Sequence, residues 1–353
     1  MVADDIRMKR KIQQLGSSTL AVTLPAEWAR DHDARKGDEL LIQRDENGGS
    51  LLLIPESSAT ADESAVIDAD ALAPDALERA ILAQYVLGRQ LIRVESDTTL
   101  SPAALEAVAD VERQLMGLGI VEQRLERVDV RCSVAPDDFE LPTLLSRLWR
   151  TEATMREHAV DALCTGDGEL ARRTIHHERQ VEKLFYLFLR LVLTTYRNPR
   201  LNQSVGLETG FPLLGYRSVA QDVVLMTERA RRIATLVAES DDPTPLDDDT
   251  TTQFRAVADA LATTADATRA AVTEPDHEEI SRARGALNTL STAVDGAQTH
   301  LEQTRPEPLL VLQRSLTALR SSGEHATDSL DVADHFAFRS RSVVDTDATT
   351  DER

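Results

Sequence analysis

The sequence has few cysteines, few aromatic residues and no long apolar run, and each shortage excludes a class of protein. Its two cysteines, Cys132 and Cys164, are too few for a disulfide framework and lack the spacing of zinc ligands. No apolar run approaches the ~20 residues that span a bilayer. The first residues are charged from the start, so we expect no signal peptide. These features predict a cytoplasmic protein that is not inserted into a membrane.

Lysine is also scarce, although the chain is strongly charged. Against 60 acidic residues stand 39 basic ones, for a net charge of −21. The carboxylates of so acidic a surface repel one another in dilute buffer. Molar salt screens this repulsion, because it shortens the Debye length to about 3 Å. Abundant aspartate with little lysine is therefore typical of a salt-in halophile, the alternative being an ordinary acidic mesophilic protein. Lysine occurs only at Lys9, Lys11, Lys36 and Lys183.

Catalytic motifs are absent as well. The chain has no Gly-rich phosphate loop, no H-E-x-x-H, no G-x-S-x-G and no Glu-x-x-His di-iron pairing. Phe185, Tyr186 and Phe188 have the spacing of core residues on a helix. We therefore expect a protein that is not an enzyme and needs no cofactor. A metal-dependent enzyme built on helical carboxylates is the remaining catalytic alternative.

The residues that are present predict a multidomain α+β fold. Residues 1–56 alternate as short strands around turns, with a short helix after Pro25. So small a β unit is hard to stabilise alone, so we expect it to dimerise. Residues 57–136 begin as a linker and then alternate strands with helices, which predicts a small α/β domain. Here we expect helices over 74–87 and 102–116.

Helical periodicity dominates from residue 137 onward. Six long helices are expected, interrupted by Gly, Pro and acidic runs, and they indicate two three-helix bundles over 137–242 and 243–336. The polar residues 337–353 are expected to be disordered. The expected helices lie near 139–164, 167–197, 210–240, 250–273, 276–304 and 306–335.

Three motifs near the N-terminus have a distinctive order and spacing. They are Leu15-Gly-Ser-Ser-Thr-Leu-Ala-Val-Thr-Leu-Pro25, Lys36-Gly-Asp38 and Leu51-Leu-Leu-Ile-Pro55. Together they resemble the AbrB/MazE/SpoVT swapped-hairpin DNA-binding domain over about residues 7–56. The resemblance implies a dimer whose interleaved hairpins carry basic side chains onto DNA. The candidate DNA-binding residues are Lys9, Arg10, Lys11, Arg30, Arg35, Lys36 and Arg44.

The charge balance of this module only partly supports DNA binding. Residues 1–56 carry a net charge of about −2, against about −19 for the remainder. Some members of the family have arginines where this chain has Ser17 and Ala29. The alternative is therefore a module that serves only for dimerisation.

The helical part, about residues 137–335, resembles the PhoU family. The stretches that carry the resemblance are 178–186, 227–234 and 323–330. The order of an AbrB-like head, an α/β segment and a PhoU-like tail is similar to a group of archaeal PhoU-type regulators. The resemblance implies control of phosphate uptake, with a phosphate ABC transporter ATPase or a signalling kinase as partner.

PhoU-family members often hold a metal cluster on Glu/Asp-x-x-x-Asp pairs, since carboxylates four residues apart share one helix face. Two of the pairs are broken here, because Arg232 and Arg320 stand where acids are expected. Arginine cannot ligate a metal, so we expect ion pairs at these positions instead of a metal cluster. The matching acidic positions are Glu178, Glu182, Glu228 and Glu324.

Two functions remain open at this point. The first is a dimeric DNA-binding regulator that represses or damps phosphate transport, with DNA and a homodimer or higher oligomer as partners. The second is a transporter-associated signalling adaptor in which the AbrB-like head only dimerises.

Overall fold

A computed structural model describes residues 9–31, 33–44, 51–55, 64–198, 201–207, 211–240 and 243–347. It forms two compact units, Met1–Glu63 and Ser64–Arg353, and each is described by itself. Within the described ranges, no helix is both long enough and apolar enough to cross a membrane.

The first unit consists of two antiparallel hairpins and one short helix. Strand β1, Gln13–Leu15, pairs with β2, Thr19–Ala21. Gly16 adopts a φ of +79° in the turn between them, a conformation that favours glycine. Helix α1, Ala26–Asp31, follows Pro25 as expected for a proline at a helix start. Strand β3, Leu40–Arg44, pairs with β4, Leu51–Pro55.

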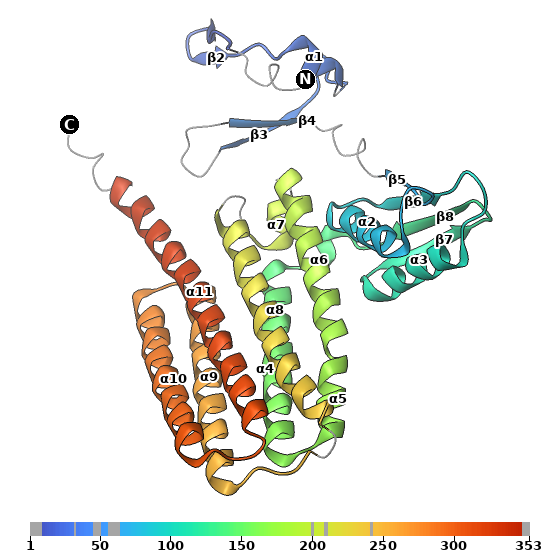
Figure 1. The fold of residues 1–353 in the computed structure, drawn as a ribbon. Coiled ribbons are helices and arrows are strands. Elements are labelled where there is room, and N and C mark those ends of the chain that lie inside the picture. The colour runs from blue at the N-terminus through green and yellow to red at the C-terminus, as the bar shows by residue number, and fades with distance from the viewer. Residues whose placement is uncertain are drawn as a thin grey trace. The chain divides into compact units, whose positions relative to one another are not determined.

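The second unit begins with the predicted α/β segment (Figure 1). Its four strands are ordered β5-β6-β8-β7, with β5 and β6 parallel and the other neighbours antiparallel. Helices α2 and α3 pack against the sheet through Ile81, Tyr85 and Val108, which are buried with Ile92 and Val130 of the strands. The elements are β5 Ser64–Asp68, α2 Pro74–Val86, β6 Leu91–Glu95, α3 Pro102–Gln114, β7 Leu118–Gln123 and β8 Arg127–Cys132.

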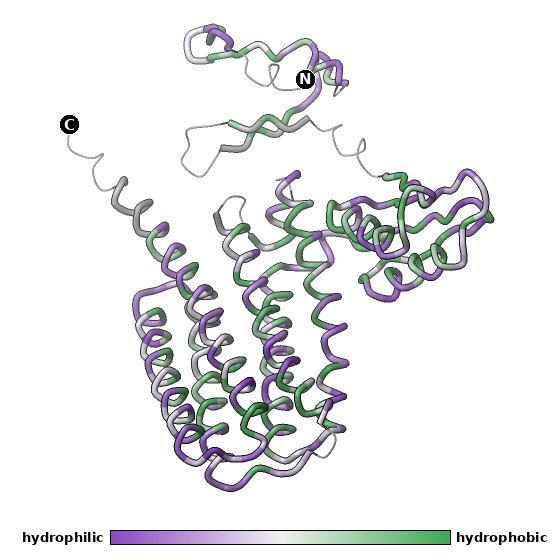
Figure 2. Tube along the Cα trace, viewed as in Figure 1, coloured by the Kyte–Doolittle hydropathy of each residue, from purple (hydrophilic) through white to green (hydrophobic). Residues whose placement is uncertain are grey.

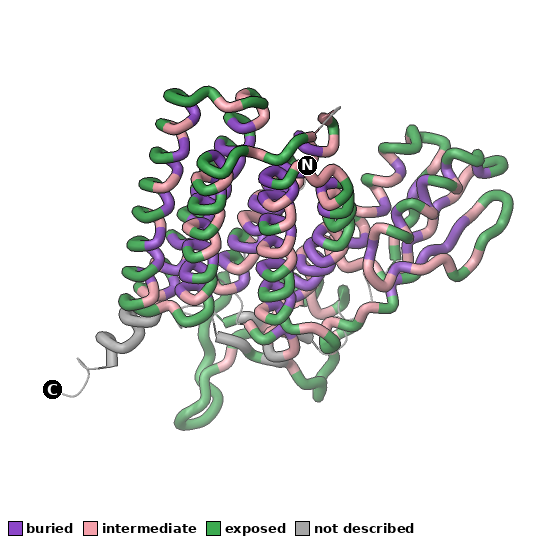
Figure 3. Tube along the Cα trace, turned by 90° about the horizontal axis from the view of Figure 1, so that it is seen from below, coloured by how far each residue is buried: buried purple, intermediate pink, exposed green. Residues whose placement is uncertain are grey.

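Long helices make up the rest of the second unit, as predicted. They fall into a group of α4 to α8 and a group of α9 to α11, and both groups share one continuous apolar core (Figure 3). Aspartate caps set helix starts here, as where Asp247 accepts the N–H of Thr250 and Asp276 that of Glu279, both at 2.8 Å. The helices are α4 Leu141–Thr165, α5 Gly168–His176, α6 Glu178–Arg197, α7 Asn202–Val205, α8 Phe211–Ala238, α9 Asp248–Thr273, α10 His277–Thr304 and α11 Leu309–Asp347.

Two expectations for this part were wrong. The single helix expected over 167–197 is divided at His177, where the N–H of His177 bonds to Thr174 and that of Gln180 bonds to His177. These three-residue steps tighten the turn and interrupt the α-helix. The disordered tail expected from residue 337 is instead the continuation of α11 as far as Asp347, since no Gly or Pro follows Gly323 to stop the helix.

Arg190 of α6 joins the α/β segment to the helices. Its guanidinium is buried and donates to the carbonyl oxygens of Tyr85 at 2.6 Å, Arg89 at 3.0 Å and Gly88 at 3.2 Å. It also lies over the Tyr85 ring, 4.9 Å from the centroid. A cation at the C-terminus of α2 satisfies the carbonyl of Tyr85 in its last turn and interacts favourably with the helix dipole.

The backbone at this joint requires glycine. Gly88 has a φ of +89°, and a Cβ there would lie 2.7 Å from the Oγ1 of Thr194 on α6. Tyr186, which we expected in the helical core with Phe185 and Phe188, packs against the α/β core instead. Helix α6 therefore contributes side chains to both cores of the second unit.

Replacing Arg190 with alanine should lower the free energy of unfolding of the second unit by about 3 kcal/mol, because buried carbonyls lose a charged donor. Arg197→Ala is the matched control, since Arg197 is exposed and donates to Leu87 at 2.9 Å; its cost should stay below about 1 kcal/mol. Denaturant unfolding of the two variants measures both values. Equal losses would contradict the assigned role of Arg190.

Candidate functional site

The candidate DNA-binding residues of the first unit lie on four separate segments. Arg30 is near the end of α1, and its Nε donates to the carbonyl of Ala26 at 3.3 Å. Arg35 and Lys36 lie in the turn before β3, which is closed because the Asp38 carboxylate accepts the N–H of Arg35 at 2.7 Å. Both side chains are exposed. The turn therefore presents two cations outward.

The remaining candidates flank the first and third strands. Lys9, Arg10 and Lys11 are exposed in the segment just before β1. Arg44 ends β3, but its side chain lies outside the described residues. The acidic neighbours of the module partly offset these charges, as where Asp33 lies 3.7 Å from Arg35. The charge of the first unit is therefore compatible with contact to DNA phosphates, but it does not by itself predict DNA binding.

The described side chains of the first unit form no buried core. None of the residues between 9 and 55 whose burial is described is buried (Figure 3), and several of the large apolar ones are exposed. Hydrophobic residues occur in both hairpins (Figure 2). Two-stranded hairpins are marginal in water without an apolar face to pack against. The exposed side chains are Ile12, Leu15, Leu20, Val22, Ile42 and Leu51.

The carboxylates matched to the PhoU metal positions are partly brought together. The Nε of Arg231 lies 2.8 Å from the Oε1 of Glu178, near the start of α6. Burial raises the pKa of Glu178, Arg231 lowers it, and the nearby charges of Glu182 and Glu228 raise it, so the pKa ends above its usual range. Arg231 thus supplies the positive charge among these three acids. Glu324 of α11 instead accepts a hydrogen bond from Ser321 at 3.3 Å.

The ion pairs expected within single helices form with other partners. Arg231 pairs with Glu178 of another helix, whereas the pair expected between Glu228 and Arg232 is not formed among the described side chains. Arg320 lies 3.9 Å from Asp295 of α10 rather than pairing with Glu324. The i, i+4 rule was wrong here because long arginine side chains reach acids on adjacent helices.

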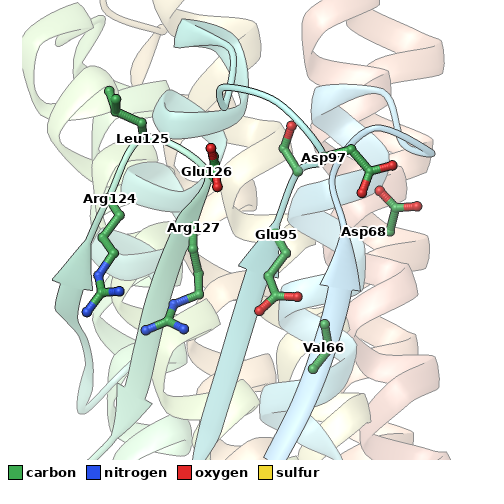
Figure 4. Close-up of a pocket in the computed structure, with 9 residues that line it drawn as sticks. Val66, Asp68, Glu95, Asp97, Arg124, Leu125, Glu126 and Arg127 are labelled. Atoms are coloured by element: carbon green, nitrogen blue, oxygen red, sulfur yellow. The ribbon is translucent and has the colours of Figure 1, made fainter.

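A cleft of about 850 Å³ lies at the end of the α/β sheet, in a segment for which the sequence predicted no function (Figure 4). Its acidic side chains exceed its basic ones, and the latter are paired. Arg127 donates to Glu122 at 2.6 Å and lies 3.2 Å from the nearly buried Asp129. The cleft is therefore anionic. It is lined by Val66, Asp68, Glu95, Ser96, Asp97, Arg124, Leu125, Glu126 and Arg127.

A second cleft, of about 480 Å³, separates α4 from α9 and has a buried ion pair in its wall. Glu152 is fully buried, and its Oε1 accepts from the Nε of Arg156 at 2.9 Å. Arg156 also donates to the carbonyl of Ala258 on α9, at 3.5 Å. Sequence spacing did not indicate that this pair is buried, because an acid four residues before an arginine usually forms an exposed ion pair.

Two family models match separate parts of the chain. The model described as antidote-toxin recognition MazE, bacterial antitoxin, matches residues 13–61, and the model of the PhoU domain matches residues 145–237. No curated protein matches the chain. The chain thus combines an N-terminal MazE/AbrB-type domain with a C-terminal PhoU domain, as the motifs indicated. The PhoU match covers most of α4 and all but the last residue of α8, so it coincides with the first group of helices.

Replacing Arg231 with alanine should leave Glu178 without its ion-pair partner, beside the negative charges of Glu182 and Glu228. The loss at pH 7 should be on the order of 1 kcal/mol or less, because the ion pair is half exposed. A carboxyl with a raised pKa destabilises the fold only while it is ionised, so the loss should disappear as the pH falls through that pKa. Urea unfolding of the Arg231→Ala variant at pH 7 and at a pH below the pKa of Glu178 measures the loss of stability. The control is the Arg232→Ala variant, because Arg232 is the exposed neighbour. A loss that persists at acid pH would contradict it.

Proposed function

We propose that the protein is a dimeric DNA-binding regulator of phosphate uptake that represses or damps phosphate transport. The observation that carries the proposal is the presence of a MazE-type domain and a PhoU domain on one chain. The two matched segments do not overlap, so each can keep its own role. The first would grip DNA, and the second would report phosphate status by contact with a partner protein, such as the transporter ATPase or a signalling kinase.

The distribution of charge supports DNA binding by the first unit. Nearly all of the negative charge lies outside residues 1–56. Within the module, Arg30, Arg35 and Lys36 are exposed and can approach phosphates, which supply most non-specific affinity. A duplex is therefore repelled least at this end of the chain.

The exposed apolar side chains of the module support a dimer. Burying one leucine or isoleucine side chain contributes roughly 1.5–3 kcal/mol. A second copy of the module could cover Leu15, Leu20 and Ile42 along with the others, which would bury apolar side chains that are exposed in one copy. Interleaved hairpins achieve this because strands of one copy then pack between strands of the other.

A second function is favoured by the charge of the module, which is close to neutral rather than basic. In this case the head would only dimerise, and the helices would act as a signalling adaptor at the phosphate transporter. Both functions need the dimer, so the oligomeric state does not distinguish them. Only the regulator binds DNA, so DNA occupancy in cells does.

Leu20→Asp should convert the protein from dimer to monomer, because it places a charge on the apolar face of β2. Leu125→Asp is the matched control, since Leu125 is also exposed but lies in the α/β segment. Light scattering of the purified full chain in molar salt gives the mass of each. A Leu20→Asp variant that stays dimeric would show that the module is not the dimer interface.

Replacing Arg10, Lys11 and Arg30 together with alanine should abolish discrete DNA occupancy in cells. In vitro, the slope of log affinity against log salt should become shallower by about one per lost phosphate contact. The control replaces Arg172, Arg179 and Arg232, which are exposed on the helices. Genome-wide occupancy of tagged proteins in phosphate-rich and phosphate-starved cells is the measurement. Occupancy that is absent even for the unaltered protein would favour the adaptor.

A further inference from the structure

Helices α8 and α11 run antiparallel and pack closely along their length (Figure 1). Near one end, Gly215 of α8 leaves room for the ring of Phe336. Further along, the hydroxyl of Ser329 donates to the Oδ2 of Asp222 at 3.0 Å. This contact joins the first group of helices to the second.

Three potential metal ligands meet beside that hydrogen bond. Asp222 comes from α8, and His325 and Asp328 come from one face of α11. One ligand atom from each lies within 4.8 Å of the others. The Nδ1 of His325 is 3.7 Å from the Oδ2 of Asp328, too far for a hydrogen bond.

The imidazole of His325 is the unexplained group of this cluster. Both of its ring nitrogens are buried, and neither has a hydrogen-bond partner. A neutral imidazole carries one donor and one acceptor, and native proteins satisfy nearly all such buried atoms. A histidine kept only for packing would leave both without compensation.

The charge of the partly buried Asp222 carboxylate is also poorly balanced by its neighbours. Burial raises its pKa to about 6, the hydrogen bond from Ser329 lowers it, Asp328 raises it and Arg217 lowers it. Arg217, on its own helix, donates to Gln221 at 3.5 Å rather than pairing with Asp222. The cluster therefore brings two carboxylates and a histidine together, and Arg217 forms no described ion pair with Asp222.

We propose that Asp222, His325 and Asp328 form a binding site for one divalent transition-metal ion. One imidazole nitrogen and two carboxylate oxygens suit zinc and its neighbours, which are borderline between hard and soft. Ligands about 2.1 Å from a tetrahedral ion are about 3.4 Å apart, so closure needs side-chain shifts of roughly 1 Å. Water takes the fourth position, since Asp328 is exposed.

This site differs from the positions matched to the PhoU metal motif. It uses none of Glu178, Glu182, Glu228 or Glu324, and it lies between α8 and α11 rather than between α6 and α8. Its consequence is mechanical, because the ion would tie the two groups of helices together at one point. The proposal goes beyond phosphate regulation and stands without it.

Titration of the chelator-treated full chain with Zn²⁺ and with Co²⁺ tests the site. Calorimetry gives the stoichiometry, and the visible spectrum of Co²⁺ reports the coordination geometry. We expect one ion per chain, a tetrahedral or five-coordinate Co²⁺ spectrum, and a higher Tm with Zn²⁺. His325→Gln and Asp222→Asn should each weaken binding by about 100-fold or more, since even partners outside the ligand sphere contribute about 10–100-fold. Asparagine can still accept the hydrogen bond from Ser329, so Asp222→Asn keeps that contact.

The control variant combines Glu178→Gln with Glu228→Gln and should retain full affinity. Circular dichroism without metal shows that each variant is folded. Absence of binding at micromolar metal would overturn the proposal. So would affinity that His325→Gln leaves unchanged, or that the glutamate control abolishes.

Discussion

The guanidinium of Arg190 lies where α6 meets the end of α2, and it donates to the carbonyl of Tyr85 in the last turn of that helix and to those of Gly88 and Arg89 just after it. A buried charge is costly unless hydrogen bonds satisfy it, so these carbonyls and Arg190 depend on each other. Tyr85 reinforces the joint because its ring lies under the guanidinium while its hydroxyl donates to Met116 at 2.9 Å. The α/β segment and the helices of the PhoU domain consequently belong to one compact unit.

The first unit is stabilised in a different way. The second unit has two large cores, whereas the first has no buried residue among those described. In the proposed dimer its stability would come from association, so folding and self-association of the module would be one equilibrium that depends on protein concentration. DNA that binds two copies at once would shift that equilibrium further. A regulator built in this way would respond to its own abundance, without any change in the PhoU domain.

Much of the architecture was predictable because local signals agree with one another. Pro74 and Pro102 begin α2 and α3, the aspartates at 247 and 276 cap α9 and α10, and helical spacing marks the buried faces. The break at His177 was not predictable, since it involves no Gly or Pro. The contacts of Arg190 were not predictable either, because its partners lie about a hundred residues away in the sequence.

The candidate sites divide in the same way. The basic residues of the module were located by motif, and those whose side chains are described are exposed, while their contact with DNA stays a prediction. The acidic positions were found by resemblance, but spacing along one helix could not show that Arg231 rather than Arg232 faces Glu178. The cluster of Asp222, His325 and Asp328 joins two helices whose register the sequence does not encode in any short motif. Asp222 comes close to His325 and Asp328 only when α8 and α11 pack.

Salt would act on the proposed DNA complex in two opposing ways. Phosphate contacts by the module release counterions, so their contribution weakens as salt rises. The acidic second unit repels the duplex, and this repulsion also weakens as the Debye length falls from about 10 Å at 0.1 M to about 3 Å at 1 M. With only a few cations in the module and about −19 outside it, repulsion dominates at low salt. Affinity would therefore pass through a maximum at intermediate salt instead of falling steadily, and the acidic surface would then favour binding in brine over binding in dilute solution.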